Sequence, residues 1–591
     1  MKKDVTLLGF VRRVTGSKVY VEILSEVLSA NPIIHGRVYR LGQIGSFVRI
    51  PLGFLKLYGI VSMVGSSEIS HPDDIDIPLP HGQRWIEVQL VGESYGNEEF
   101  QRGISVFPTL DDEVHIVTED DLATIYNTSD SSMVDIGTHA ASESLPATIN
   151  LDKIVTRHAA ILGSTGSGKS NIVAAFLRTL TGGCFPSAKI VIIDPHSEYS
   201  AAFQGLARVF SIGDKNYPLV VPYWALSFDE LAWFFVGRKE AFEDIRDLTF
   251  RDKIYQMKQA SIPILKAGTV SKDEITPDSP IPFDIRQLWY DFDRPERVTY
   301  EDSEYTKEAL IEEGDIYSLK SAKFKQHSPY NQAPYKAKVA VLTLAYANKI
   351  LARLKDKRFK FLLDPEPYGG KEGGKDLHDL LIDWIGHKHA ITVFDLGGIP
   401  SEVTDLIVGV ITRILFETMF WGGDLPGIGR QRPLLIVYEE AHTYLSKSGD
   451  TQFITGYAKR SGRRIFKEGR KYGIGAIVVS QRPSELDDTI LSQCGTFFAL
   501  RISNSDDQGR IRSTIPETFS GLVDLLPVLR TGEAIVLGEA VQIPSRIRFP
   551  LIEPRPKSED PEPAKRWKES QLFSPPYAKA ITGWRKQKKL L

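Results

Sequence analysis

Hydrophobic and polar residues alternate along the first part of the chain, residues 1–135. The stretch KVYVEIL places Val19, Val21 and Ile23 on one face, and RWIEVQLVG repeats the pattern. A period of two residues is typical of half-buried strands, and the glycine- and proline-rich breaks between the runs favour turns. The pattern therefore predicts a small antiparallel β-barrel or sandwich. No catalytic constellation stands out here, and we expect this domain to serve assembly or partner docking.

From about residue 136 the pattern changes to continuous apolar runs. Such runs are typical of strands buried on both faces, and several are separated by helix-length segments. The order predicts a mostly parallel α/β sheet whose sequence falls into two parts, residues 136–222 and 390–548. The runs are HAAILG, AKIVIID, AITVFDL, PLLIVYEE, IGAIVVSQ, GTFFALRI and EAIVLG.

Charged, amphipathic sequence interrupts the sheet pattern between residues 223 and 389. Residues 229–250 and 336–356 read as helices, and a polar, proline-rich connection fills about 260–335. We therefore expect a helical bundle inserted into the α/β domain. Residues 549–591 form a C-terminal extension that opens like a linker and ends in the basic stretch WRKQKKLL.

Length and composition narrow the class of protein. The 591 residues are too many for one core and imply about three or four domains. The net charge of the chain is -3, so the protein as a whole does not attract phosphate groups. A nucleic acid would therefore have to bind a local basic surface. Two cysteines, Cys184 and Cys494, cannot build a disulfide framework. No apolar run is long enough to span a membrane, and the start of the chain does not read as a signal peptide, so we expect a cytoplasmic protein that binds no membrane.

The stretch ILGSTGSGKSN fits the spacing G-x-x-x-x-G-K-[ST] of a phosphate-binding loop. Its glycines let several N–H groups point at a phosphate, and the helix that follows adds its positive end. Lys169 would neutralise the β- and γ-phosphates of ATP, and the Ser170 hydroxyl would bind Mg²⁺. A chance Gly/Ser-rich loop is the alternative, but a strand and a helix flank this one. The expected nucleotide-binding residues are Gly163, Ser164, Thr165, Gly166, Ser167, Gly168, Lys169, Ser170 and Asn171.

Acidic and polar residues follow three of the other predicted strands. Glu439 and Glu440 end PLLIVYEE, and we expect Glu439 to hold the Mg²⁺ shell and Glu440 to polarise the attacking water. Gln481 ends the next strand and could sense the γ-phosphate. Asp194 and Glu198 follow AKIVIID and could either face the nucleotide or cap a turn. An acidic helix start is the plain alternative for the two adjacent glutamates.

A basic helix is predicted between the two glutamates and Gln481. Five of its cations fall at helical spacing and would share one face: Arg460, Arg463, Arg464, Lys467 and Lys471. One use is contact with a phosphate backbone, and another is an arginine finger that enters the ATP site of a neighbouring subunit. We expect the finger to be Arg463, Arg464 or Arg470, with Arg157 as a weaker candidate.

With these motifs in place, the chain resembles the HerA family of hexameric DNA translocases, in the wider group that includes FtsK and the conjugation ATPases. The resemblance spans about residues 155–540 and is carried by these stretches in family order: RHAAILGSTGSGKSN, VIIDPHSEY, VFDLGGIP, LLIVYEEAHTYL, EGRKYGIGAIVVSQRPSELDDTILSQCGTFFALRI and LRTGEAIVLG.

The resemblance implies a RecA-like P-loop ATPase core with an N-terminal β-barrel and an inserted helical bundle. It implies a homohexameric ring, ATP at subunit boundaries and double-stranded DNA in a central channel. It also implies Glu440 as the catalytic glutamate and Gln481 as the sensor. One departure is Glu439, where family members usually carry aspartate. His442 matches the family motif, although a structural role at a helix start explains it equally well.

Relatives of this kind also dock a second protein, either a nuclease or an NAD-consuming enzyme. We therefore expect an ATP-driven DNA motor that works with such a partner in DNA end processing or anti-phage defence. An alternative is a ring scaffold that activates an effector enzyme. In that case the activity of the effector would survive Glu440→Ala. A conjugation or chromosome-partition pump is disfavoured by the lack of apolar membrane segments.

Overall fold

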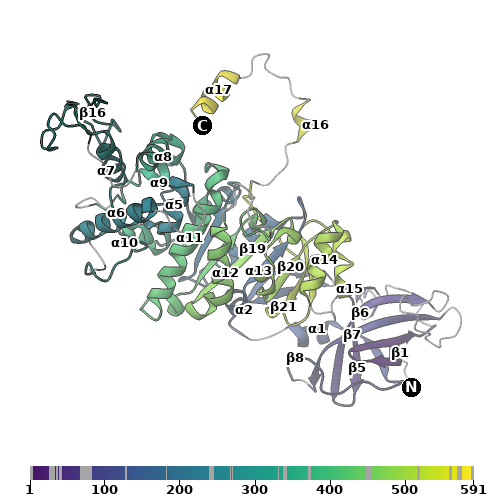
Figure 1. The fold of residues 1–591 in the computed structure, drawn as a ribbon. Helices are drawn as coiled ribbons and strands as arrows, with labels where there is room; N and C mark the ends of the chain where they lie inside the picture. The colour runs from purple at the N-terminus through teal and green to yellow at the C-terminus, as the bar shows by residue number, and fades with distance from the viewer. Residues whose placement is uncertain are drawn as a thin grey trace. The chain divides into compact units, whose positions relative to one another are not determined.

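The structure is a computed structural model in which the chain forms two compact units, shown together in Figure 1. The first unit comprises Met1–Ala207, Met419–Ser448 and Arg463–Pro561. The second comprises Arg208–Thr418, Gly449–Gly462 and Glu562–Leu591. Within these bounds the structure describes residues 4–25, 33–34, 37–38, 43–66, 83–96, 98–126, 130–140, 142–181, 183–237, 245–265, 268, 270–330, 332–336, 343–369, 374–447, 456–515, 520–557, 562–568 and 576–586.

The N-terminal part of the first unit is a closed antiparallel barrel, which confirms the predicted barrel. Each strand pairs with the next, and the pairing of β2 with β7 closes the ring. Around the ring the strands are β1 (Leu7–Thr15), β2 (Lys18–Ile23), β7 (Arg84–Tyr95), β6 (Leu55–Ser66), β5 (Phe47–Leu52) and β9 (Glu113–Ile116). Smaller elements beside it are β3 (Ile33–Ile34), β4 (Arg37–Val38), β8 (Gln101–Arg102) and α1 (Glu119–Tyr126).

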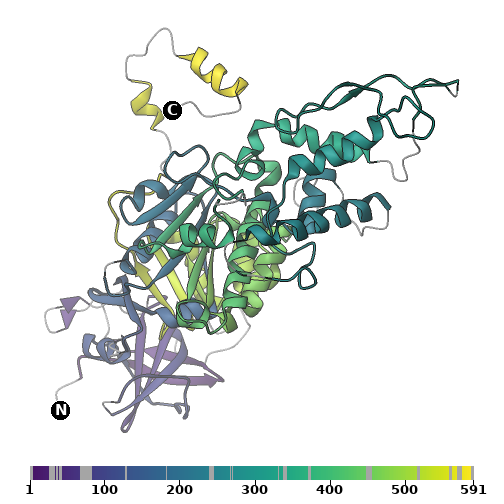
Figure 2. The ribbon, with the colours of Figure 1, turned by 90° about the vertical axis from the view of Figure 1, so that its left-hand side faces the viewer.

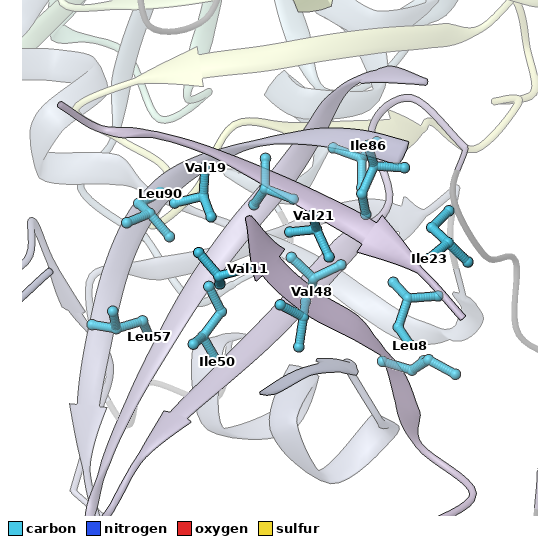
Figure 3. Packing of buried hydrophobic residues seen from close by; sticks show 14 residues of the cluster. Leu8, Val11, Val19, Val21, Ile23, Val48, Ile50, Leu57, Ile86 and Leu90 are labelled. Atoms are coloured by element: carbon cyan, nitrogen blue, oxygen red, sulfur yellow. The ribbon is translucent and has the colours of Figure 1, made fainter. Parts of the chain in front are cut away.

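The barrel core is made of the apolar residues that alternate in sequence. Val19, Val21 and Ile23 all belong to the buried cluster drawn in Figure 3. The opposite face of β7 is less exposed than alternation alone suggests. Glu87 is buried there because its carboxylate accepts a hydrogen bond from Ser62 Oγ (2.7 Å) and lies near Lys18.

A large sheet forms the rest of the first unit. Its parallel part is β20 (Thr496–Ala499), β12 (Ala159–Leu162), β19 (Ile474–Ser480), β18 (Leu434–Tyr438) and β13 (Lys189–Asp194), in that order. From β20 outward the sheet is antiparallel, through β21 (Glu533–Gly538), β22 (Ser545–Arg548), β10 (Met133–His139) and β11 (Ser142–Asn150). The predicted parallel core is therefore present, with an antiparallel extension on one side.

Helices of the first unit lie along the connections between these strands. The P-loop helix is α3 (Lys169–Thr179), and α2 (Leu151–Arg157) precedes β12. The others are α4 (Tyr199–Ala202), α13 (Asp488–Ser492), α14 (Ser505–Thr514) and α15 (Ser520–Val523). The basic helix, α12 (Tyr457–Glu468), and the long helix α11 (Ser401–Gly422) each run across a boundary between the units.

The second unit is mainly helical (Figure 2). Its helices are α5 (Phe228–Val236), α6 (Ile245–Ser261), α7 (Ile285–Arg297), α8 (Leu344–Lys355), α9 (Lys360–Leu363) and α10 (Leu377–Leu381), with α16 (Pro563–Arg566) and α17 (Tyr577–Arg585) near the C-terminus. Its strands are β14 (Ala207–Ser211), β17 (Ile391–Asp395), β15 (Leu310–Glu312) and β16 (Lys323–Phe324). Within the parts of the chain that the structure describes, no helix has the length and apolarity needed to cross a bilayer.

Helix α7 lies where the sequence suggested only a polar connection. Leu288 and Trp289 on this helix are fully buried, and Phe292 packs on Phe250 of α6 with ring centroids 6.0 Å apart. Asp284 caps its first turn by accepting hydrogen bonds from Arg286 N and Gln287 N. Its buried apolar residues, Ile285, Leu288, Trp289 and Phe292, recur at the helical spacing i, i+3, i+4 and i+7, so the sequence carried a helix signal that its proline-rich surroundings obscured.

Candidate nucleotide-binding site

The P-loop lies at the carboxyl edge of the parallel strands, between β12 and α3. β12 has a parallel neighbour on each side, β19 and β20, so the chain must leave this edge and turn sharply. The turn uses the left-handed backbone of Gly166 (φ 72°) and Gly168 (φ 101°), and Gly168 is the N-cap of α3. Glycine adopts these angles without strain. The predicted strand, loop and helix are therefore all present.

Hydrogen bonds from three other segments hold the loop in place. Ser164 donates to the carbonyl oxygen of Arg501 from both its main-chain N (2.9 Å) and its Oγ (2.8 Å). Gly163 N donates to Ser480 O at 3.2 Å. On the far side, Gly532 N donates to Ser167 O at 3.0 Å. The loop is thus preorganised by the protein itself, which reduces the ordering needed when a phosphate binds.

Lys169 stands at the start of α3 and is only 7% exposed. Its Nζ donates to Ser164 O at 3.3 Å, within the loop. Burial lowers the pKa of this ammonium group, and the charge of Glu440 is the strongest influence that opposes the shift. A positive side chain at a helix N-terminus, beside the N–H donors of the loop, is the charge arrangement that suits a bound phosphate.

Ser170 and Asn171 bond to segments that lie far away in the sequence. The Ser170 hydroxyl donates to Glu198 Oε2 at 2.7 Å. Asn171 Nδ2 donates to Pro550 O at 2.9 Å, and its Oδ1 accepts from Ile552 N at 3.2 Å. The segment that follows β22 therefore lies against α3, so at least its first residues are part of the folded unit rather than a free linker.

Glu439 ends its strand in a fully buried site. Its Oε2 accepts a hydrogen bond from the phenol of Tyr199 at 2.7 Å, and both side chains are at most 1% exposed. Burial raises the pKa of Glu439 well above its ordinary value, and the nearby negative charges of Glu198 and Glu440 raise it further. Burial therefore disfavours the charged form of Glu439.

Glu440 is held in a different state by its own surroundings. Its backbone adopts a left-handed conformation (φ 46°), which turns its side chain out of the strand direction taken by Glu439. Burial pushes the pKa of Glu440 upward, but the contact with His442 and the charge of Lys169 hold it below its ordinary value. Oε2 is buried and lies 3.2 Å from His442 Nδ1, yet it accepts no well-aligned hydrogen bond. A charged oxygen without a full set of donors is suited to bind a water molecule.

Gln481 lies beside the phosphate loop. Its Oε1 accepts a hydrogen bond from Thr165 Oγ1 at 2.5 Å. The preceding residue, Ser480, places its Oγ 3.2 Å from His442 Nδ1. Polar contacts therefore connect the end of β19 with Glu440: Ser480 contacts His442, and His442 contacts Glu440.

The candidate arginines occupy three different environments. Arg463 makes a paired contact with the carboxylate of Asp487, at 3.0 and 2.6 Å. Arg464 lies over the ring of Phe420, 5.4 Å from its centroid. Arg470 is exposed and follows the end of α12, and Arg157 lies 3.5 Å from Glu539. The expectation that Lys471 shares the face of the helix is wrong, because α12 ends at Glu468 and a tighter 3-10 turn follows over Gly469–Tyr472.

Several contacts of the site carry little sequence signal. Arg501 and Gly532 reach the P-loop through main-chain atoms, which any residue possesses. Tyr199 gave no signal because an aromatic residue after a strand usually belongs to the core. Glu198 was visible in DPHSEY, but only the fold shows that it bonds to Ser170.

The arrangement fits Mg·ATP. Lys169 and the P-loop amides can hold the phosphates, and the charge of Glu440 lies close enough to Lys169 to shift its pKa. Ser170 and Glu198 supply the hard oxygen atoms that Mg²⁺ prefers, whereas the carboxyl group of Glu439 is bonded to Tyr199. The fold and this site define a P-loop ATPase.

Residues 134–415 match the family described as Helicase HerA, central domain. A HerA of Sulfolobus acidocaldarius, named a DNA double-strand break repair helicase, is 28% identical over 463 residues, which cover 78% of this chain and 77% of that protein. A HerA of Sulfurisphaera tokodaii with the same description is 26% identical over 462 residues, with the same two coverages. The chain is therefore similar to the HerA helicases over most of its length, and residues 134–415 match their central domain.

Two solved structures are also similar in fold. VirB4 of Thermoanaerobacter pseudethanolicus matches with a TM-score of 0.44 and 14% identity, covering 72% of this chain and 98% of that one. The plasmid coupling protein TrwB, solved in complex with ADP and Mg²⁺, matches with a TM-score of 0.42 and 14% identity, covering 74% of this chain and 93% of that one.

Proposed function

We propose that this chain is an ATP-driven motor on double-stranded DNA, acting as a homohexameric ring with a partner nuclease or NAD-consuming effector. The process would be DNA end processing or anti-phage defence. The observation that carries the proposal is the pairing of a preorganised P-loop with a charged Glu440 that has an unsatisfied buried oxygen. The names of the relatives, DNA double-strand break repair helicases, supply the DNA part of the proposal.

Each proposed residue has a distinct task in hydrolysis. Lys169 and the P-loop N–H groups bind the phosphates and neutralise their charge. Glu440, kept ionised by Lys169 and His442, orients a water molecule and accepts its proton. Ser170, oriented by Glu198, would hold Mg²⁺, which would supply positive charge to neutralise the phosphates. Gln481, bonded to Thr165 of the loop, reports the presence of the γ-phosphate to β19 and its neighbours.

An arginine from a neighbouring subunit would complete the site. Arg470 is the preferred candidate, because Arg463 is already engaged by Asp487 within its own chain. Lys467 and Arg460, exposed on α12, are the proposed contacts for the DNA backbone.

The test is ATP hydrolysis with and without duplex DNA. The wild-type chain is expected to hydrolyse ATP faster when duplex DNA is added, and Lys169→Ala is expected to abolish that turnover. DNA-stimulated turnover that persists in Lys169→Ala would refute the site. If the partner enzyme is instead activated equally by wild type and by Glu440→Ala, the chain is a scaffold rather than a motor.

A further inference from the structure

The hydroxyl of Ser170 is already engaged, and its partner is not the residue that the motif suggests. In a P-loop ATPase an acidic residue at the end of a neighbouring strand is expected near the metal. Here that residue is Glu439, and its Oε2 is bonded to the buried phenol of Tyr199. The carboxylate that accepts the Ser170 proton is Glu198, at 2.7 Å.

The geometry of this bond decides what it can do for a metal. A serine hydroxyl has one proton and two lone pairs. When the proton is donated to Glu198, the lone pairs of Ser170 Oγ point elsewhere and are available to a cation. Glu198 therefore orients Ser170 as a metal ligand without having to touch the metal itself.

Glu198 is fixed by its backbone as well as by this bond. Its main-chain oxygen accepts a hydrogen bond from Lys557 N at 2.8 Å, so the segment after β22 contacts it. On the preceding side, Asp194 accepts from the main-chain N of both His196 (3.2 Å) and Tyr199 (3.0 Å), which closes the turn that carries Glu198. Hydrogen bonds on both sides of Glu198 therefore fix the loop that positions its carboxylate.

The contacts of the three glutamates agree with this division of roles. Mg²⁺ is usually held by one or two carboxylates together with the phosphates of its nucleotide. The carboxyl group of Glu439 is buried and bonded to Tyr199, and Glu440 Oε2 lies 3.2 Å from His442 Nδ1. Glu198 remains as the acidic group in direct contact with Ser170.

We propose that Glu198, rather than Glu439, is the carboxylate that positions Mg²⁺ in this site, by accepting the Ser170 proton and presenting that oxygen to the metal. The proposal rests on the nucleotide site argued above. It departs from the assignment drawn from the strand-end motif, in which Glu439 holds the metal shell. Glu439 instead stabilises the interior through Tyr199.

The experiment measures metal binding rather than turnover. Mn²⁺ is titrated into the full chain with a non-hydrolysable ATP analogue, and free Mn²⁺ is followed by electron paramagnetic resonance. Glu198→Gln, which is isosteric, is expected to weaken Mn²⁺ binding by about tenfold or more, as loss of an orienting partner does at other metal sites. Glu439→Gln is expected to change it less than about threefold. Affinity for the analogue in EDTA is expected to be unchanged in Glu198→Gln.

Glu93→Gln is the matched control, because Glu93 also accepts a serine hydroxyl, from Ser105 at 3.0 Å, but does so in the barrel. It is expected to leave Mn²⁺ binding unchanged. Glu198→Asp keeps the charge but shortens the reach to Ser170, so it is expected to weaken Mn²⁺ binding as well, and it serves if the glutamine variant does not fold.

The results separate this inference from the wider function. Loss of Mn²⁺ binding in Glu439→Gln but not in either Glu198 variant would overturn it. Failure of the wild-type chain to bind Mn²⁺ with the analogue would overturn both this inference and the proposed ATP-driven function. The expected binding pattern without DNA-stimulated hydrolysis would support Glu198 and refute only the DNA motor.

Discussion

Two adjacent carboxyl groups, Glu439 and Glu440, occupy opposite electrostatic environments. Glu439 continues the strand into the core and meets Tyr199, whereas the left-handed backbone of Glu440 turns its side chain toward Lys169 and His442. Burial and neighbouring charges separate their pKa values, one upward and one downward. Two titratable groups with opposed environments are typical of a divided chemical role.

Glu440→Gln should retain nucleotide but lose turnover. The amide keeps the size of the side chain and removes the base, so ATP hydrolysis is expected to fall by about 10²- to 10⁴-fold. Fluorescent-nucleotide binding and steady-state hydrolysis, measured on the same preparation, check this. Glu93→Gln in the barrel serves as control and should hydrolyse ATP like wild type. Near-normal hydrolysis by Glu440→Gln would remove it from the catalytic role.

At the scale of elements, α3 is tied to a segment almost four hundred residues further along the chain. Asn171 bonds to Pro550 and Ile552, and Arg178 Nη1 donates to Glu553 O at 2.7 Å. The P-loop helix is therefore held at both ends by the residues that follow β22.

Asn171→Ala should release this segment. Two hydrogen bonds are lost, each worth about 1 kcal/mol, so the amide of Ile552 is expected to exchange with solvent at least about tenfold faster. Hydrogen exchange read by mass spectrometry on a peptide that contains Ile552 measures the change. Asn216→Ala, on an exposed loop of the second unit, is the control. Unchanged exchange would show that the segment is held without Asn171.

Helix α6 carries a fully buried cation, Lys258, whose Nζ donates to Pro277 O (2.6 Å) and Ser279 O (2.8 Å). Burial lowers the pKa of Lys258 to about 7, from an ordinary value of 10.5. The unfolded chain thus binds more protons than the folded chain between these two pH values, and the contribution of Lys258 to stability rises with pH across that window.

Lys258→Met should remove this pH dependence. Relative to the variant, the wild-type chain is expected to gain on the order of 1 kcal/mol of unfolding free energy per pH unit above pH 7. Urea unfolding of the second unit, followed from pH 6.5 to 9, gives the difference between the two curves. Lys253→Met, on the same helix and paired with Asp291, should leave the slope of wild type. Parallel curves for wild type and Lys258→Met would contradict the shifted pKa.

The sequence predicted the strands of this molecule better than their directions. Every continuous apolar run is a strand, because burial on both faces leaves a plain signal in composition. The run EAIVLG did not indicate that β21 pairs antiparallel with β20, because the direction of a strand depends on the connection that leads to it and not on its own residues. Helix α7 was missed, and the partnership of Tyr199 with Glu439 joins residues that no local pattern relates.

At the scale of the whole molecule, the nucleotide site and Arg470 lie at opposite ends of the same strand. Gly163 of the P-loop bonds to Ser480 at the end of β19, whereas Arg470 precedes Ile474 at its start. Seven residues of strand span roughly 20 Å, which is beyond the reach of an arginine side chain. If Arg470 takes part in hydrolysis, it therefore acts on another copy of the chain.

Mixing two inactive variants should then restore hydrolysis. Glu440→Gln keeps its arginine and Arg470→Ala keeps its glutamate, so a boundary that combines one of each in the right order contains an intact site. Random assembly of equal amounts is expected to give about a quarter of wild-type turnover. Hydrolysis that stays at the level of the separate variants, after mixed assembly is verified by native mass spectrometry, would exclude Arg470 as the finger.

The order of strands also determines when the chain can fold during its synthesis. Thr138 of β10 pairs with Arg548 of β22, so the hairpin of β10 and β11 meets its neighbour only after some four hundred further residues have been translated. At ordinary ribosome speeds that is a delay of roughly 20 to 80 s. Throughout that time the hairpin has an open hydrogen-bonding edge, which is a template for aggregation. A nascent chain that stalls after its catalytic motifs but before β22 would therefore depend on chaperones, even though its ATP site had already been translated.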